Sequence, residues 1–180
     1  LMLQDVVETT VATGHTPVVL ATEPVNLDVD CVTSTESLSS AVNAALQSTL
    51  EQGQPSVDQN ATRSKAVIMA DLGIVSKDAL SRLFSSESDV VIAPGLKGGT
   101  NALVVRSPTF HVDYHNFSYL DHRAIAKEYG LTVSEIDSFR LACDMDRPSD
   151  IVELFLHGTG LAAEFITERF ELAPERHSLP

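Results

Sequence analysis

Two short apolar runs flank a glycine-rich loop near the middle of the chain, and this arrangement constrains the fold most. Residues 89–93 and 101–105 are rich in Val and are predicted to be strands. The loop between them holds three glycines, with Lys97 as its only charge. Glycine permits positive φ and close approach of a ligand, and successive N–H groups in such a turn attract anions. The loop is therefore either an ordinary hairpin connection or a site for a substrate's phosphate or carboxylate, beside Lys97. Its spacing fits neither the Rossmann nor the P-loop pattern.

Helix and strand signals alternate along the rest of the sequence. Helices are predicted at 1–13, 37–52, after Ser76, at 118–129, 148–156 and 161–170, and strands at 17–21, 29–32, 65–70, 131–136 and 139–143. The polar segment 53–64 is predicted to be a surface loop. The run 65–70 is apolar without alternation, which is typical of a central parallel strand covered on both faces. This pattern predicts an α/β three-layer fold with a mainly parallel sheet, as a single domain over residues 1–180.

The charge balance excludes two classes of partner. Asp and Glu number 25 against 12 Lys and Arg, which gives a net charge of −13. A nucleic-acid surface or an anionic membrane needs a basic face, so neither is expected. A salt-adapted source and an ordinary acidic protein explain the excess equally well. No apolar run approaches the roughly 18 residues that span a bilayer. Cys31 and Cys143 lack metal-ligand spacing and are expected to be reduced, which suits a cytoplasmic enzyme.

Three aspartates follow predicted strands directly. Asp71 comes after the run 65–70, and Asp144 and Asp146 come after 139–143. Ligands of open α/β sheets bind outside the carboxyl ends of the strands, so we expect these carboxylates to converge there. Asp144 and Asp146 are two residues apart, so in extended chain they point the same way, and hard oxygen ligands of this kind suit Mg²⁺. The alternative for Asp146 is a cap on the next helix.

Four blocks of sequence carry a resemblance to a known family. They are Ala70-Asp71-Leu72, Gly98-Gly99-Thr100-Asn101-Ala102-Leu103, Ser118-Tyr119-Leu120-Asp121-His122 and Asp144-Met145-Asp146-Arg147-Pro148-Ser149-Asp150. In this order and spacing the chain resembles the archaeal 2-phospho-L-lactate guanylyltransferases, whose nucleotidyltransferase fold is shared with molybdopterin guanylyltransferase. The resemblance covers residues 1–170, and the block 98–103 is its specific part.

The resemblance implies a nucleotide-diphospho-sugar-transferase-like fold and an activity. Such an enzyme joins GMP from GTP to 2-phospho-L-lactate and releases pyrophosphate, in the biosynthesis of coenzyme F-420. Carried over by motif, the catalytic and Mg²⁺-binding acids are Asp71, Asp144 and Asp146. The residues expected to contact the acceptor are Lys97, Gly98, Gly99, Thr100, Asn101, Ser118 and His122, and those expected near the nucleotide base are Leu38 and Ser39.

Several departures and alternatives accompany this interpretation. Gly73 stands where the family usually has Pro, and Ser39 where it commonly has Asn. The family opens with a strand and a basic loop that grips the triphosphate; this sequence begins after both, so the fold is expected without its N-terminal strand. Phosphoenolpyruvate or a sugar phosphate is the alternative acceptor. A non-catalytic binding or assembly subunit is the alternative function should the basic loop be absent. We also expect a homodimer through the apolar face of 161–170.

Overall fold

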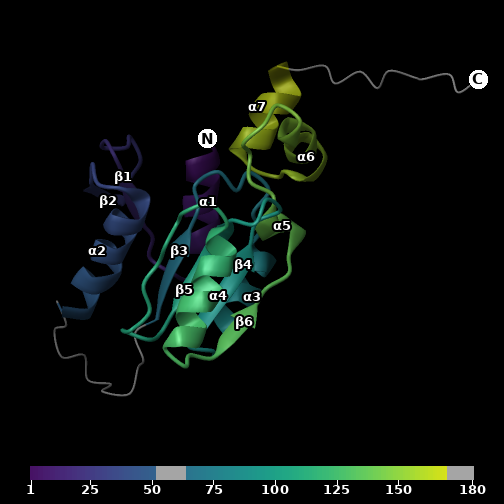
Figure 1. Cartoon of the computed structure of the whole chain (residues 1–180). Helices are drawn as coiled ribbons and strands as arrows, with labels where there is room; N and C mark the ends of the chain where they lie inside the picture. The colour runs from purple at the N-terminus through teal and green to yellow at the C-terminus, as the bar shows by residue number, and fades with distance from the viewer. Residues whose placement is uncertain (52–63, 170–180) are drawn as a thin grey trace, which may run out of the picture.

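The computed structural model describes residues 1–51 and 64–169 (Figure 1), so nearly all of the predicted loop 53–64 lies outside it. The helices are α1 (Met2–Ala12), α2 (Leu38–Glu51), α3 (Lys77–Ser85), α4 (Ser118–Glu128), α5 (Phe139–Ala142), α6 (Asp150–His157) and α7 (Leu161–Arg169). The strands are β1 (Val18–Ala21), β2 (Asp30–Thr33), β3 (Lys65–Ile68), β4 (Val90–Pro94), β5 (Thr100–Val105) and β6 (Val133–Glu135). No helix in the described ranges is long and apolar enough to cross a membrane.

The main sheet has four strands in the order β3-β5-β4-β6. β4 and β5 pair antiparallel across the glycine loop, and β3 pairs antiparallel with β5. β6 is parallel to β4, and β1 and β2 form a separate parallel pair. The α/β class is confirmed, but the described sheet is mixed where a mainly parallel one is expected. A connection as short as the glycine loop can join β4 and β5 only as antiparallel neighbours. β3 pairs with the other edge of β5, so β5 lies between β3 and β4.

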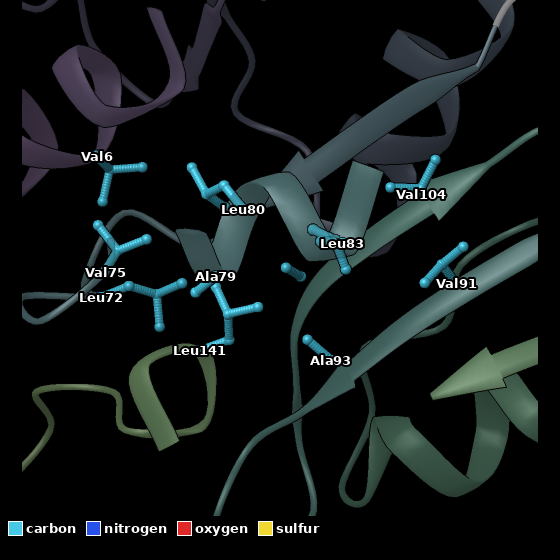
Figure 2. Close-up of a cluster of buried hydrophobic side chains, with 11 residues drawn as sticks. Val6, Leu72, Val75, Ala79, Leu80, Leu83, Val91, Ala93, Val104 and Leu141 are labelled. Atoms are coloured by element: carbon cyan, nitrogen blue, oxygen red, sulfur yellow. The ribbon is translucent and has the colours of Figure 1, made fainter. Parts of the chain in front are cut away.

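Helices cover both faces of this sheet, because alternate side chains of β4 and β5 point to opposite sides. Val91 and Val104 pack with α1, α3 and α5 on one face, in the cluster that Figure 2 shows. Val90 and Leu103 pack with α2 and α4 on the other face. All eleven residues of β4 and β5 except Pro94 are buried. The predicted three-layer arrangement is therefore confirmed, with the central hairpin as its core.

Two predicted strands differ from the structure. The run 65–70 is predicted to be a central parallel strand, but β3 is antiparallel and has one partner among the described strands. The run 139–143 is predicted to be a strand, but it forms the short helix α5. A short apolar run does not distinguish the two states by itself. Here the helical turn buries Leu141 in the core and leaves Phe139 44% exposed, and it lets Arg140 Nη1 donate to the carbonyls of Ile74 and His157, both at 3.0 Å.

The C-terminal helices α6 and α7 form a third cluster, which Figure 1 shows beyond one end of the sheet. A buried carboxylate fastens α7 to α1: Asp5 accepts the backbone N–H groups of Leu161 (2.8 Å) and Ala162 (2.9 Å). A Cβ on Gly160 would lie 2.5 Å from the Asp5 carboxylate, so a glycine is needed there. Asp5 thus caps α7 from another helix. The homodimer through 161–170 stays a prediction, and Phe170 lies outside the described residues.

We expect Asp5→Ala to lower the free energy of unfolding by about 2–3 kcal/mol, because two buried N–H groups lose a charged acceptor. Urea denaturation measures this change. The control is Glu8→Ala, which removes an exposed acid of the same helix and is expected to change stability by at most about 0.5 kcal/mol. Equal effects of the two substitutions would show that the cap contributes nothing.

Candidate active site

Three carboxylates converge as the sequence predicts. One oxygen from each of Asp71, Asp144 and Asp146 can be chosen so that all three lie within 4.8 Å of one another. Their elements differ from the prediction, because Asp71 lies in the turn after β3 and Asp144 follows α5. Asp146 does not cap α6, since α6 begins at Asp150 with Ser149 as its N-cap residue. The carboxylates therefore meet through turns and not through the ends of parallel strands.

Asp71 differs from the other two acids in having a buried oxygen atom that no donor in the described part of the chain contacts. Its Oδ1 is buried and has no hydrogen-bond partner among the described residues. Burial raises the pKa of the Asp71 carboxyl above its ordinary value, and the charges of Asp144 and Asp146 add to this effect. A buried carboxylate oxygen without a donor is costly unless a cation or proton meets it. The donor set therefore fits a hard divalent cation such as Mg²⁺.

Lys97, predicted to contact an anionic substrate, reaches the acids in this structure. Its Nζ lies 3.2 Å from Asp144 Oδ2, 3.1 Å from Asp146 Oδ2 and 3.4 Å from Asp150 Oδ2. Partial burial lowers the pKa of the Lys97 ammonium, but the hydrogen bonds with Asp146 and Asp144 outweigh it and raise the pKa above its ordinary value. Lys97 is therefore charged and supplies a positive charge to the acidic cluster.

Asp150 belongs to this site, although no role is predicted for it from the sequence. Its Oδ2 accepts the backbone N–H groups of Asp146 (3.1 Å) and Arg147 (2.9 Å) as well as Lys97. The hydrogen bond from Arg147 is the main cause that holds the pKa of Asp150 below its ordinary value. Asp150 therefore fixes the backbone that carries Asp146. The third Asp in the Asp-x-Asp block, four residues after Asp146, was the available signal.

The three glycines of the loop have different surroundings. Gly98 has φ +81°, and a Cβ there would lie 2.7 Å from Phe117 Cδ1. A Cβ on Gly95 would lie 2.6 Å from Asn101 Oδ1, whereas on Gly99 the nearest atom would be 3.9 Å away. The N–H of Gly98 donates to Gly95 and its carbonyl accepts the N–H of Tyr119. Gly98 therefore has the backbone conformation that needs glycine, and its turn lies against the N-terminus of α4.

The other residues predicted to contact the acceptor substrate are buried. Exposed fractions are 3% for Thr100, 7% for Asn101, 4% for Ser118 and 0% for His122. Asn101 Nδ2 donates to the carbonyls of Leu141 and Ala142 and lies 3.5 Å from Asp144 Oδ1. The structure thus buries these side chains, with Asn101 bonded to α5 and Thr100 bonded to His122 of α4, and their substrate contacts stay predictions.

A hydrogen-bonded pair within this group fixes one histidine tautomer. His122 Nε2 accepts the N–H of Asp113 at 3.1 Å, so in the neutral ring Nδ1 carries the proton and donates to Thr100 Oγ1 at 2.8 Å. The ring also makes an edge contact with Tyr114, at 5.0 Å between centroids. Burial is the main cause that lowers the pKa of His122 to about 4. Thr100 and a neutral His122 therefore link β5 to α4 through a buried hydrogen bond.

Leu38 and Ser39, predicted to lie near the nucleotide base, belong to the first turn of α2. Leu38 is 50% exposed, and Ser39 Oγ accepts the N–H of Tyr114 at 2.8 Å. One turn on, Asn43 exchanges two hydrogen bonds with the backbone of Val112. Ser39 therefore helps to hold α2 against the segment 112–114, and its nucleotide contact stays a prediction.

We expect the stability of the protein to fall as pH drops from about 6.5 to 4, by up to about 3 kcal/mol from His122. The unfolded His122 takes up a proton below pH 6.5, whereas the folded ring stays neutral to about pH 4. The stabilisation is thus complete above pH 6.5 and is lost on acidification. Urea denaturation of wild type and His122→Gln at several pH values isolates this share. Parallel pH profiles of the two proteins would contradict it.

Comparisons with known proteins place this chain in a family and support its fold. Residues 1–179 match the family described as "Guanylyl transferase CofC like". Among solved structures, the fold is similar to a protein from Desulfovibrio desulfuricans G20 assigned as a nucleotide-diphospho-sugar transferase. The TM-score is 0.70 at 12% identity, covering 93% of this chain and 79% of that one. A hypothetical transferase from Thermus thermophilus gives a TM-score of 0.54 at 16% identity, covering 83% and 85%. At these identities the structures support the fold alone.

Relatives of similar sequence share one name, 2-phospho-L-lactate guanylyltransferase. The protein from Halomicrobium mukohataei is 46% identical over 166 residues, which cover 92% of this chain and 76% of the relative. The protein from Haloarcula marismortui is 43% identical, covering 95% and 79%, and that from Haloferax volcanii is 45% identical, covering 93% and 76%. The family match extends over nearly the whole chain and these identities exceed 40%, so the chain belongs to the family of CofC-like guanylyl transferases.

Proposed function

We propose that this protein transfers GMP from GTP to 2-phospho-L-lactate with release of pyrophosphate, in the biosynthesis of coenzyme F-420. The observation that carries this proposal is the convergence of Asp71, Asp144 and Asp146 beside the glycine loop. It occurs in a chain that is 46% identical to a relative named for that reaction. Carboxylates that bind a cation and a glycine turn that receives an anion are the two parts that the reaction needs.

The chemistry requires positioning more than a protein nucleophile. A phosphate oxygen of the acceptor attacks the α-phosphorus of GTP, a new P–O–P bond forms, and the bond to pyrophosphate breaks. The protein must therefore hold two anionic substrates in line. A bound Mg²⁺ supplies neutralisation of phosphate charge. Asp71, Asp144 and Asp146 are the residues that would hold it, and the orphan Oδ1 of Asp71 supports that assignment.

The glycine loop is the proposed site for the acceptor's phosphate. The N–H groups of Lys97 and Gly99 have no hydrogen-bond partner among the described residues. The loop also lies at the N-terminus of α4, since Tyr119 N donates to Gly98 O at 3.2 Å. The dipole of α4 and the free N–H groups of Lys97 and Gly99 both favour an anion, whereas the N–H of Tyr119 is already bonded to Gly98. Thr100 and Ser118 are the proposed hydroxyl donors, and His122 is proposed to orient the Thr100 hydroxyl through their hydrogen bond.

The test of the function is product formation by the protein with GTP, Mg²⁺ and each acceptor separately. We expect a guanylylated product with 2-phospho-L-lactate, detected by mass spectrometry with equimolar pyrophosphate, and at least tenfold less with phosphoenolpyruvate or a sugar phosphate. Asp71→Asn is expected to lower the rate by about 100-fold or more, because the site loses a charged ligand. Asp78→Asn, an exposed acid on α3, is the control. Transfer that prefers another acceptor would overturn the assignment.

The glycine loop predicts different outcomes for two neighbouring substitutions. Gly98→Ala is expected to lower stability by about 1–2 kcal/mol, because a side chain is strained at positive φ. Gly99→Ala adds a methyl group whose nearest neighbour is Asn101 Oδ1 at 3.9 Å, an ordinary van der Waals contact, and is expected to leave the melting temperature unchanged. It is also expected to raise KM for phospholactate more than KM for GTP, because its methyl group lies beside the proposed N–H donor. Steady-state kinetics and thermal melting measure both. An unchanged KM for phospholactate in Gly99→Ala would remove Gly99 from the phosphate site.

A further inference from the structure

We propose that Lys97 and a divalent cation compete for the same carboxylates, so that cation binding releases Lys97 to the anionic substrate. The inference rests on the proposed function, which assigns the cation to Asp71, Asp144 and Asp146. It adds an exchange in which Lys97 first bonds to the acids and then, once the cation is bound, to the phosphate of the acceptor substrate. Lys97 thus offsets part of the negative charge of the acids before the cation binds, and the cation takes over that role afterwards.

The contacts of Lys97 carry the first step. Its Nζ bonds to the Oδ2 atoms of Asp144 and Asp146, two of the three acids in the convergent group. The Asp144 side chain is 14% exposed and that of Lys97 is 35% exposed, so solvent screens this contact only in part. A divalent cation held by these carboxylates would lie close to the ammonium group and repel it. The two positive charges therefore exclude each other from this position.

Asp150 is the acid that can keep Lys97 near the site after the cation has displaced it from Asp144 and Asp146. It lies outside the convergent group of three acids, yet its Oδ2 also contacts Lys97, at 3.4 Å, and is held by two backbone N–H groups. Lys97 is part of the loop whose N–H groups are proposed to bind the acceptor's phosphate. A lysine displaced from Asp144 and Asp146 thus keeps a nearby acid and gains access to the phosphate. Asp150 accordingly acts as a positioning residue for Lys97.

Binding of Mn²⁺, followed by electron paramagnetic resonance of the free ion, tests the competition without any substrate. We expect Lys97→Met to bind Mn²⁺ about tenfold more tightly than wild type, because the competing charge is gone. The matched control is Arg147→Met, which removes an exposed positive charge from the segment that carries Asp144 and Asp146 and is expected to change affinity by at most about twofold. Equal gains in the two variants, or unchanged or weaker binding in Lys97→Met, would overturn the inference.

A second measurement detects whether Lys97 is displaced from Asp144 and Asp146 in the wild-type protein. The chain has four lysines, at 65, 77, 97 and 127, so acetylation of each is resolved by mass spectrometry. We expect Mn²⁺ or Mg²⁺ to speed acetylation of Lys97 relative to exposed Lys77 and Lys127. Slower or unchanged acetylation overturns the exchange, even if Lys97→Met fails to fold. Competition together with no GMP transfer would leave this inference standing and overturn the proposed function alone.

Discussion

Asn101 holds together the three segments from which the site is built, through its buried carboxamide and its backbone carbonyl. Its Nδ2 donates to the carbonyls of Leu141 and Ala142, and its backbone carbonyl accepts the N–H of Met69 at 2.9 Å. Each such bond contributes about 1 kcal/mol, but leaving buried partners unsatisfied costs more. One residue of the central strand β5 thus positions the turn before Asp71 and the turn before Asp144. The convergence of the acids depends on this junction.

Other contacts tighten the same junction and restrict its side chains. Leu96 N donates to Ala142 O, and Met145 N donates to Asp71 O, so the glycine loop and both acidic turns share hydrogen bonds. Asp71 O also accepts the N–H of Gly73, a bond that Pro at position 73 could not supply. Gly73 therefore supplies a hydrogen bond to the turn that carries Asp71. These backbone hydrogen bonds hold the three aspartates close together, and Lys97 offsets part of the repulsion between their carboxylates.

The sequence predicts the parts of this protein whose causes are local. Ser76 begins α3 as expected, because its side chain accepts the N–H of Ala79. The runs beside the glycine loop are strands, because their Val-rich character is strong enough to decide the state. The prediction of a strand at 139–143 is wrong because the helix there depends on distant partners, namely the core around Leu141 and the carbonyls to which Arg140 donates. The direction of β3 likewise depends on β5, which follows more than 30 residues later.

The site shows the same division between local and distant causes. Three aspartates after apolar runs were enough to predict their convergence, but the partners of Lys97 follow from tertiary structure alone. Sequence treats Gly95, Gly98 and Gly99 alike, whereas the structure separates them. Gly95 makes room for Asn101 and Gly98 adopts positive φ. Gly99 has neither constraint among the described residues, since a Cβ there meets only Asn101 Oδ1 at 3.9 Å. The proposed phosphate site would account for a small residue at this position, because a side chain there would stand beside the N–H of Gly99, which is free within the described ranges.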